Sequence, residues 1–206
     1  IEVRGESGAV PRLVFSELDV VLRATRDLFA GGVTKIYADT KMDYERIRDF
    51  VTTFEPEGID EVELYEKPEP IFDSFGVEVE LERALQRKVW LKSGGYIIID
   101  QAEALSVVDV NSGRFVGKSS LEDTITQINL EAVKEVAYQV RLRNIGGIVI
   151  IDFIDMDDDS HRKQVLGSLK KALLVDKVAT FISDFTVLGL VQVNRKRTNK
   201  SLKELL

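Results

Sequence analysis

Two hydrophobic segments of the chain each end in an aspartate, and these aspartates are the residues whose positions best suit chemistry. The first segment is Leu105–Asp109, and the second is Ile148–Asp152. Both are typical of buried strands, and a buried carboxylate is costly unless it is paired, hydrogen-bonded or bound to a metal. We therefore expect Asp109 and Asp152 to lie at the ends of neighbouring strands and to share a cation. The alternative is that each aspartate only caps a turn.

The composition of the 206-residue chain restricts the kind of cation. The sequence contains no cysteine and one histidine, His161, which excludes thiolate sites and a histidine-rich zinc site. A catalytic metal would therefore bind oxygen ligands, which favours Mg²⁺, with Mn²⁺ as the second choice and zinc not expected. Asn111 shares a strand face with Asp109 because strand side chains alternate, and its amide could orient a ligand or a water. On the same reasoning, Asp155 should face away from Asp152.

Composition also indicates a folded protein of the cytoplasm. The hydrophobic fraction is 44% and there are only 4 prolines, so the chain can bury a substantial core. No run of about 18 apolar residues predicts a membrane span, and the lack of cysteine fits a reducing compartment. Because residue 1 is Ile, we expect the chain to be a piece of a longer protein.

Charge is unevenly distributed, which leaves room for a nucleic-acid partner despite the net charge of −7. Residues 1–90 carry 12 basic and 20 acidic side chains, whereas residues 91–206 carry 16 and 15. Arg141 and Arg143 lie near the end of a predicted helix, and the basic run Arg195–Arg197 lies close to the C-terminus. Each group could contact phosphates. The alternatives are charge complementarity with the helix dipole for the first group and a solvated chain end for the second.

The elements that position these residues follow from hydrophobic periodicity. The first part of the chain predicts a small α/β unit. Its expected elements are a helix over 14–30, a strand over 33–38, a helix over 42–54, a strand over 62–65 and a helix over 71–86.

The second part of the chain predicts a mixed or antiparallel sheet with helices packed on it. The strand over 148–154 is apolar on both faces, so we expect it to lie centrally and to be covered above and below. Trp90 and Tyr96 flank a glycine turn and should pack in the core or across a hairpin rather than stack on nucleic-acid bases. The expected strands cover 89–92, 96–100, 104–111, 148–154, 180–183 and 188–195, and the expected helices cover 122–143 and 159–174.

One loop offers a different function, because it is similar to a phosphate-binding loop. The segment Ser112–Ser119 follows a predicted strand, precedes a predicted helix and ends in Gly117-Lys118-Ser119. The nucleotide-binding loop requires G-x-x-x-x-G-K-[ST], since its glycines let backbone N–H groups surround the phosphates. Ser112 stands where the first glycine belongs, and Gly113 comes one residue too late. A P-loop-like NTPase is therefore only a minor alternative.

Several segments in the same order carry a family resemblance. They are residues 93–100, 103–112, 129–132, 139–143 and 146–156. At these segments the chain resembles the catalytic core of the ribonuclease E/G family of bacteria and plastids. The resemblance implies an endoribonuclease that cuts single-stranded RNA with Mg²⁺ and leaves 5′-phosphate and 3′-hydroxyl ends.

The resemblance also implies roles for particular residues. The family's metal-binding aspartates correspond to Asp109 and Asp152, and its supporting asparagine corresponds to Asn111. Backbone phosphates of the RNA would then be contacted by basic side chains of the second half. These are Arg141, Arg143, Arg195, Lys196 and Arg197.

The resemblance implies an α/β (α+β) chain with three parts. Residues 1–20 would be a remnant of the preceding 5′-end sensor, residues 21–84 a ribonuclease H-like subdomain, and residues 85–206 a DNase I-like catalytic subdomain. The family's OB-fold RNA-binding domain is expected before the chain, and its zinc link between protomers after it, so a homo-oligomer is implied for the longer protein. Without these parts, the alternative for the chain is a weakly active or non-catalytic scaffold that binds RNA or protein. The sequence pattern does not distinguish the E-type from the G-type branch.

Overall fold

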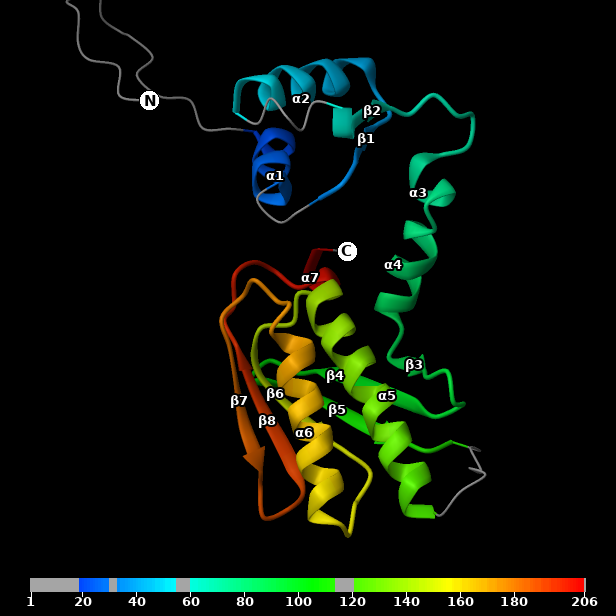
Figure 1. The fold of residues 1–206 in the computed structure, drawn as a ribbon, viewed down its shortest axis with the longest axis vertical. Helices are drawn as coiled ribbons and strands as arrows, with labels where there is room; N and C mark the ends of the chain where they lie inside the picture. Colours follow the sequence, from blue (N-terminus) through cyan, green and yellow to red (C-terminus); the bar gives the residue numbers. More distant parts are fainter. Residues whose placement is uncertain (1–18, 30–32, 55–59, 114–120, 206) are drawn as a thin grey trace, which may run out of the picture. The chain divides into compact units, whose positions relative to one another are not determined.

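The chain folds into two compact units, one up to Gly76 and one from Val77 onward. The computed structural model describes residues 19–29, 33–54, 60–113 and 121–205. Figure 1 shows their helices and strands in sequence colours. The mixed α/β class predicted from the sequence is confirmed, since each unit combines helices with a sheet.

The first unit is a small α/β arrangement around two parallel strands. Strand β1 (Ile36–Ala38) pairs in parallel with β2 (Val62–Leu64), and helix α2 (Lys41–Phe54) connects them. Helix α2 begins after Thr40, whose hydroxyl accepts a hydrogen bond from the Asp43 N–H at 3.1 Å, as expected of an N-cap. Helix α1 (Val20–Phe29) and the short α3 (Ile71–Ser74) complete the unit. The buried core residues are Ala38, Ile47, Val51 and Val62.

The second unit is built on a six-stranded mixed sheet. Its strand order is β3-β4-β5-β6-β8-β7, in which only the β5–β6 pair is parallel. The parallel pair needs a crossover, which helix α5 supplies. The strands are β3 (Lys88–Trp90), β4 (Tyr96–Gln101), β5 (Leu105–Asn111), β6 (Gly147–Asp152), β7 (Thr180–Phe185) and β8 (Leu190–Arg195). The helices are α4 (Val77–Leu85), α5 (Leu121–Leu142), α6 (Asp159–Leu173) and α7 (Leu202–Leu205).

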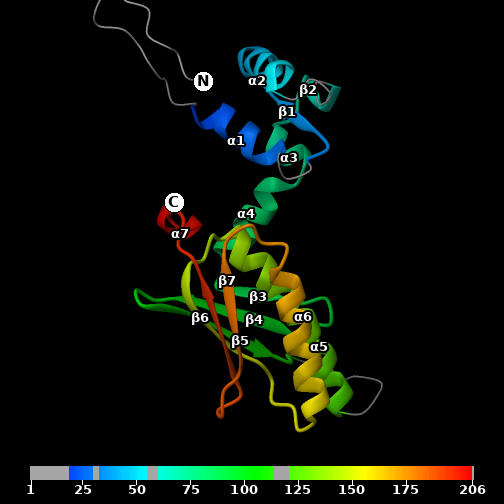
Figure 2. The same cartoon turned by 60° about the vertical axis from the view of Figure 1, so that its left-hand side comes forward.

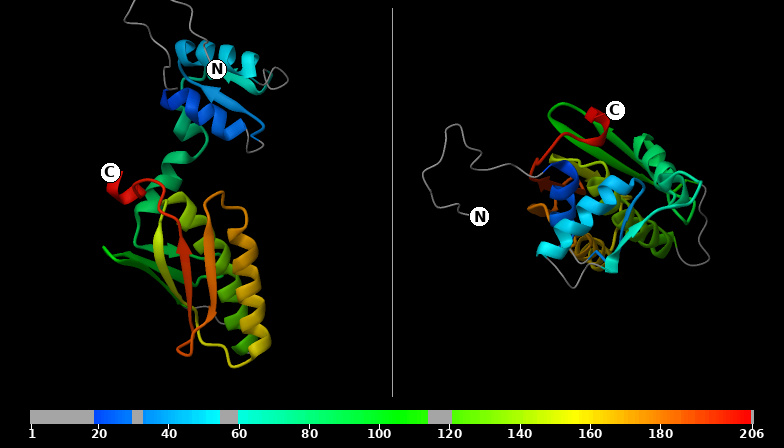
Figure 3. Two further views of the ribbon diagram at one scale, coloured as in Figure 1. Left: turned by 90° about the vertical axis from the view of Figure 1, so that its left-hand side faces the viewer. Right: turned by 90° about the horizontal axis from the view of Figure 1, so that it is seen from above.

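Helices α5 and α6 cover one face of this sheet and leave the other face open (Figure 3). Alternate strand residues such as Val108 and Val110 are buried under the helices, whereas Val107 and Asp109 are exposed. Strand β6 is central, as predicted, but the prediction that it is covered on both faces is wrong. Ile148, on its open face, is 38% exposed. Figure 2 shows the sheet and these two helices turned by 60° from the view of Figure 1.

The segment predicted as one helix over 71–86 is two helices. Gly76 has a φ of +67°, a conformation that a helix does not contain, and it separates α3 from α4. Helix α4 belongs to the second unit, because the Tyr138 hydroxyl donates to Glu80 at 3.0 Å and Arg83 pairs with Glu135 at 2.8 Å. The two compact units divide after Gly76, while the predicted ribonuclease H-like and DNase I-like subdomains, with their boundary after residue 84, stay predictions.

Two predictions concern residues outside the described ranges, and one observed helix was not expected. Helix α7 was not predicted, and residues 1–18, with the proposed sensor remnant, lie outside the description. Lys118, on which the NTPase alternative depends, also lies outside it. None of the helices in the described ranges combines the length and apolar character that a membrane crossing needs.

Candidate metal centre at the ends of β5 and β6

The parallel β5–β6 pair brings the two predicted aspartates side by side. Asp109 and Asp152 are register partners, so their backbones are separated by one strand spacing, about 4.8 Å. The Asn111 amide donates a hydrogen bond to Oδ2 of Asp109 at 2.8 Å, which holds this carboxylate in place. The predicted position of the aspartates at the ends of neighbouring strands is confirmed, and their role as metal ligands stays a prediction.

The two carboxylates are exposed rather than buried, which corrects the reason for expecting a cation. Asp109 and Asp152 both project from the open sheet face. Partial loss of hydration raises the pKa of the Asp152 carboxyl, and the negative charges of Asp109 and Asp155 raise it further. Within the described ranges, no basic side chain forms an ion pair with Asp109 or Asp152. A bound cation would offset both the partial loss of hydration at Asp152 and the repulsion between the unpaired carboxylates.

Asp155 contributes to this electrostatic cluster, although the sequence predicted that it faces away. The prediction assumed that the strand continues to residue 154, whereas β6 ends at Asp152. Beyond it the backbone leaves the pleat, and Asp155 lies near enough to raise the pKa of Asp152. In the described ranges, no three Asp, Glu, His or Cys side chains are placed to hold an ion together. Two carboxylates with retained water are nevertheless a usual donor set for Mg²⁺.

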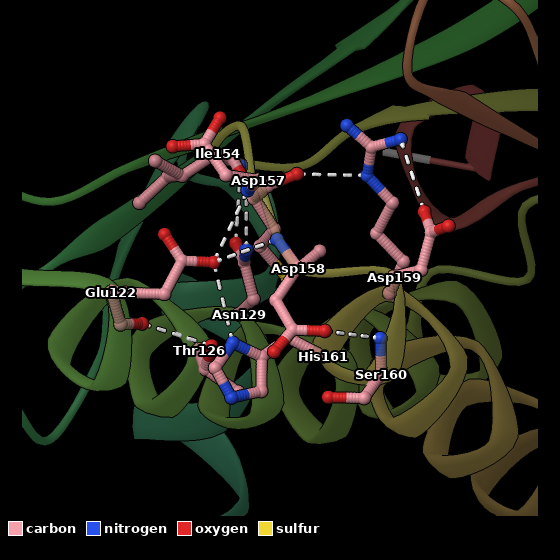
Figure 4. Close-up of polar contacts among 11 residues, drawn as sticks. Glu122, Thr126, Asn129, Ile154, Asp157, Asp158, Asp159, Ser160 and His161 are labelled. Carbon is pink, nitrogen blue, oxygen red and sulfur yellow. Dashed lines mark hydrogen bonds and ion pairs between the residues drawn. The ribbon is translucent and has the colours of Figure 1, made fainter.

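The backbone that follows Asp152 is fixed by a buried asparagine of helix α5. The Asn129 amide donates to the Ile154 carbonyl at 2.8 Å, and its side-chain oxygen accepts from the Ile154 N–H at 3.1 Å (Figure 4). Asn129 is fully buried. It was not predicted as a site residue, although a polar residue on the apolar stripe of a helix is a readable signal. Asn129 therefore positions the segment that joins Asp152 to Asp155.

Replacing Asn129 by Leu should loosen this segment and weaken the candidate cation site. Two backbone groups of Ile154 would lose their partners, which should lower the free energy of unfolding by about 2 kcal/mol. Because the residue supports the site indirectly, we expect Mg²⁺ affinity to fall about 10-fold. Urea unfolding and Mg²⁺ titration by calorimetry measure the two effects. The matched control is Gln127→Leu, an exposed position of the same helix; equal effects of both variants would contradict this role for Asn129.

A second set of contacts ties the start of α5 to the start of α6. The Glu122 carboxylate accepts hydrogen bonds from the N–H groups of Asp157 and Asp158 at 3.1 and 3.3 Å, and lies 3.3 Å from Nδ1 of His161 (Figure 4). Asp158 caps α6 by accepting from the Ser160 N–H at 2.7 Å. The predicted start of this helix at residue 159 is thus confirmed. Glu122 and Asn129 together hold both ends of the loop between β6 and α6.

The Glu122 contacts predict a pH-dependent stability. Its hydrogen bonds from the Asp158 N–H and from His161 hold the pKa of Glu122 below its ordinary value. A lowered pKa in the folded state stabilises the fold above the unfolded pKa, about 4.3, and this contribution is lost as pH falls through the folded pKa. Glu122→Gln should therefore lower the melting temperature at pH 7 and have a smaller effect at pH 3. A difference that stays constant over this range would rule out the ionised carboxylate as its source.

Arg143 and Arg195, two of the five residues predicted to contact RNA, are buried in the second unit. Arg143 is buried and donates from Nε to the Gln139 side chain at 2.7 Å and from Nη2 to the Gln86 carbonyl at 2.8 Å. Arg195 is buried and pairs with Asp176 at 2.6 Å. The guanidinium groups of Arg143 and Arg195 are therefore engaged in contacts within the protein, and we do not propose them as RNA contacts.

The other three basic residues are exposed but lie far from the aspartates. Strand β8 pairs the position of Arg195 with Gly147, at the opposite end of β6 from Asp152, a separation of about 16 Å along the strand. Arg141, Lys196 and Arg197 are near that opposite end. Arg197 lines a polar cavity of about 390 Å³ there. The structure thus separates the predicted basic residues from the acidic site.

The match to known proteins extends along nearly the whole chain. A model of the ribonuclease E/G family matches residues 1–198. The chain belongs to the ribonuclease E/G family. Ribonuclease G of Escherichia coli (strain K12) is 48% identical over 193 residues, which are 94% of this chain and 40% of that protein. Ribonuclease E of Nostoc sp. is 36% identical over 209 residues, which cover the whole chain and 30% of that protein.

Membership of the ribonuclease E/G family confirms the resemblance predicted from the five sequence segments. Ribonuclease G of Haemophilus influenzae is 46% identical over 193 residues, or 94% of this chain and 39% of that protein. These two ribonuclease G sequences are more similar to the chain than the Nostoc ribonuclease E. The chain spans about 40% of the length of the curated ribonuclease G relatives that it matches.

Proposed function

We propose that the protein is an endoribonuclease that hydrolyses single-stranded RNA with Mg²⁺ at Asp109 and Asp152. The observation that carries the proposal is the register pairing of these aspartates on an open sheet face, with Asn111 bonded to one of them. Membership of a ribonuclease family supports the same substrate class. We further propose that the enzyme acts in the cytoplasm and as a homo-oligomer.

The donor set fits a hard divalent cation. Asp109 and Asp152 would hold it through carboxylate oxygens, and water would fill the remaining positions, as is usual for Mg²⁺. When bound, Mg²⁺ would polarise the scissile phosphate and lower the pKa of a bound water. A bound cation would also offset the raised pKa of the Asp152 carboxyl, because its positive charge favours the ionised form.

Two asparagines hold the proposed metal ligands and the backbone next to them in place. Asn111 fixes the Asp109 carboxylate through its amide hydrogen bond. Asn129 fixes the backbone at Ile154, two residues after Asp152. Water attacks the phosphorus, the bond from phosphorus to the 3′ oxygen breaks, and the products carry 5′-phosphate and 3′-hydroxyl ends. The open face around the acids leaves room for an extended RNA strand.

Exposed basic side chains would hold more distant parts of the RNA. Arg141, Lys196 and Arg197 lie towards the other end of the sheet from Asp152. Contacts of this kind are electrostatic and weaken as salt is added. They would raise the affinity for RNA without taking part in the chemical step.

A cleavage assay tests the proposal directly. A labelled single-stranded RNA is incubated with excess protein, with and without Mg²⁺, and the product ends are identified by enzymatic labelling. We expect cleavage that requires Mg²⁺, with 5′-phosphate and 3′-hydroxyl ends. RNA binding without cleavage would favour the alternative of a non-catalytic scaffold, and cleavage to 2′,3′-cyclic ends would contradict the proposed attack by water.

A further inference from the structure

An exposed aromatic pair lies on the same open sheet face as the aspartates. Trp90 pairs with Tyr96 across β3 and β4, and Tyr96 pairs with Asn111 across β4 and β5. These three residues form one cross-strand row, so Tyr96 lies about 5 Å and Trp90 about 10 Å from Asn111, measured between strands. The aromatic pair is therefore next to the residue that holds Asp109.

The geometry of the pair leaves the indole available. The two rings have centroids 5.3 Å apart and meet edge to face, with an interplanar angle of 66°. Tyr96 is half-buried and supports the contact, whereas Trp90 is 59% exposed. The predicted packing across the hairpin is present, but it does not cover the indole. Val89, which precedes Trp90, and Ile97, which follows Tyr96, are buried and belong to the core.

A lysine completes the arrangement. The Lys88 ammonium lies 3.9 Å from the Trp90 ring centroid and 3.6 Å from the Tyr96 ring centroid. Lys88 is the register partner of Ile98, which is the partner of Asp109, so the lysine belongs to the cross-strand row of the aspartates. No carboxylate in the described ranges forms an ion pair with it. An aromatic surface and an unpaired cation beside a phosphate-cleaving site are the two components of a single-stranded nucleic-acid subsite.

We propose that Trp90, supported by Tyr96, stacks on one nucleobase of the RNA strand whose phosphate lies at Asp109 and Asp152. This inference rests on the proposed function. Exposed cation–π contacts are weak, so the Lys88 ammonium moves from the rings to the neighbouring RNA phosphate when the base arrives. Because every base has a stacking face, this subsite adds affinity and positions the strand without reading its sequence.

The first experiment uses Trp90 as its own reporter, since it is the only tryptophan among the 206 residues. The chain is titrated in EDTA, which prevents metal-dependent cleavage, with an oligoadenylate and with an abasic oligomer of the same length and charge. We expect saturable quenching of tryptophan fluorescence by the oligoadenylate and little quenching by the abasic oligomer. Equal quenching by the two oligomers, or the absence of any binding, would overturn the proposal.

The second experiment measures affinity by the fluorescence anisotropy of labelled oligomers. Trp90→Ala should weaken oligoadenylate binding about 10-fold, while Trp90→Tyr should restore most of the affinity and neither change should alter binding of the abasic oligomer. Phe181→Ala is the matched control, because Phe181 is 70% exposed on the far edge strand β7. An unchanged affinity of the Trp90→Ala variant, with its fold verified by circular dichroism, would refute base stacking.

The lysine has a separate readout. Lys88→Met should reduce the dependence of log K on log salt by about 0.7, the value expected for one phosphate contact on a single strand, and should leave tryptophan quenching in place. An unchanged salt dependence would remove Lys88 from the subsite. The cleavage assay with Mg²⁺ keeps the two proposals apart: stacking without cleavage contradicts the proposed enzyme, and cleavage without stacking contradicts only the subsite.

Discussion

Replacing Asp152 by Asn should abolish Mg²⁺-dependent cleavage of single-stranded RNA, with a rate loss of about a thousandfold or more. The amide has nearly the shape of the carboxylate but no charge, so it removes one of the two anionic ligands that we propose for the cation. A thousandfold loss corresponds to about 4 kcal/mol of transition-state stabilisation, which is the scale of metal-ion catalysis. Single-turnover cleavage of a labelled RNA measures the loss, and Asp109→Asn should give the same result.

The same variant should be no less stable than the parent chain. The raised pKa of Asp152 means that folding disfavours its ionised form, so this group destabilises the fold once pH rises above its ordinary pKa. Removing the charge should leave the melting temperature at pH 7 unchanged or higher when no metal is present. Asp184→Asn is the control, because Asp184 is an exposed acid on β7 whose pair with Lys170 lies on the surface. Full activity of the Asp152→Asn variant would refute the assignment of the metal site.

Replacing Arg195 by Ala should lower the free energy of unfolding by about 3–5 kcal/mol, the usual loss when one partner of a buried ion pair is removed. The side chains of Arg195 and Asp176 are 4% and 5% exposed, and Arg195 also donates to the Asn144 side chain at 3.1 Å and the Ile145 carbonyl at 3.0 Å. Without the guanidinium, the Asp176 carboxylate would be left buried and unpaired. Urea unfolding followed by circular dichroism measures the change.

The acid dependence of this pair provides an independent check. Burial alone would raise the pKa of Asp176, but its hydrogen bonds from Arg195 and from the Val178 N–H outweigh burial and lower it. The stabilisation is therefore present above the unfolded pKa and is lost as pH falls through the folded pKa. Arg87→Ala is the comparison, since it removes a surface pair with Asp100 and should change unfolding little. Similar losses from both arginines would show that burial does not set the strength of the Arg195 pair.

Most of the secondary structure could be predicted because hydrophobic periodicity is strong in both units. Strand β5, which carries Asp109, and the long helix α5 were expected within one residue of their observed ends. The break at Gly76 was missed because the flanking segments share one helical pattern. The open sheet face was missed for a different reason. A strand such as β6 is apolar on both faces whether helices cover one face or two, so composition does not reveal which.

The candidate site could be predicted in part for similar reasons. The identity of Asp109, Asn111 and Asp152 follows from strand ends and alternation, and their proximity follows once the strands are neighbours. The basic residues could not be placed from sequence, because a run of charges does not show which side chain turns inward. Arg195 and Lys196 are adjacent, yet one is buried and the other is exposed.

The parallel pairing of β5 with β6 has a consequence for the life of the newly made chain. Strands β5 and β6 are parallel, so helix α5 must cross the sheet to connect them. Asp109 can therefore pair with Asp152 only after the whole of α5 has been synthesised. Such distant contacts form slowly, since the entropy of closing the intervening loop must be overcome first. A nascent chain that has released β5 but not β6 from the ribosome has only half of the acidic pair. On the proposed mechanism such a chain should not cut RNA, because the two aspartates come together only when β6 pairs with β5.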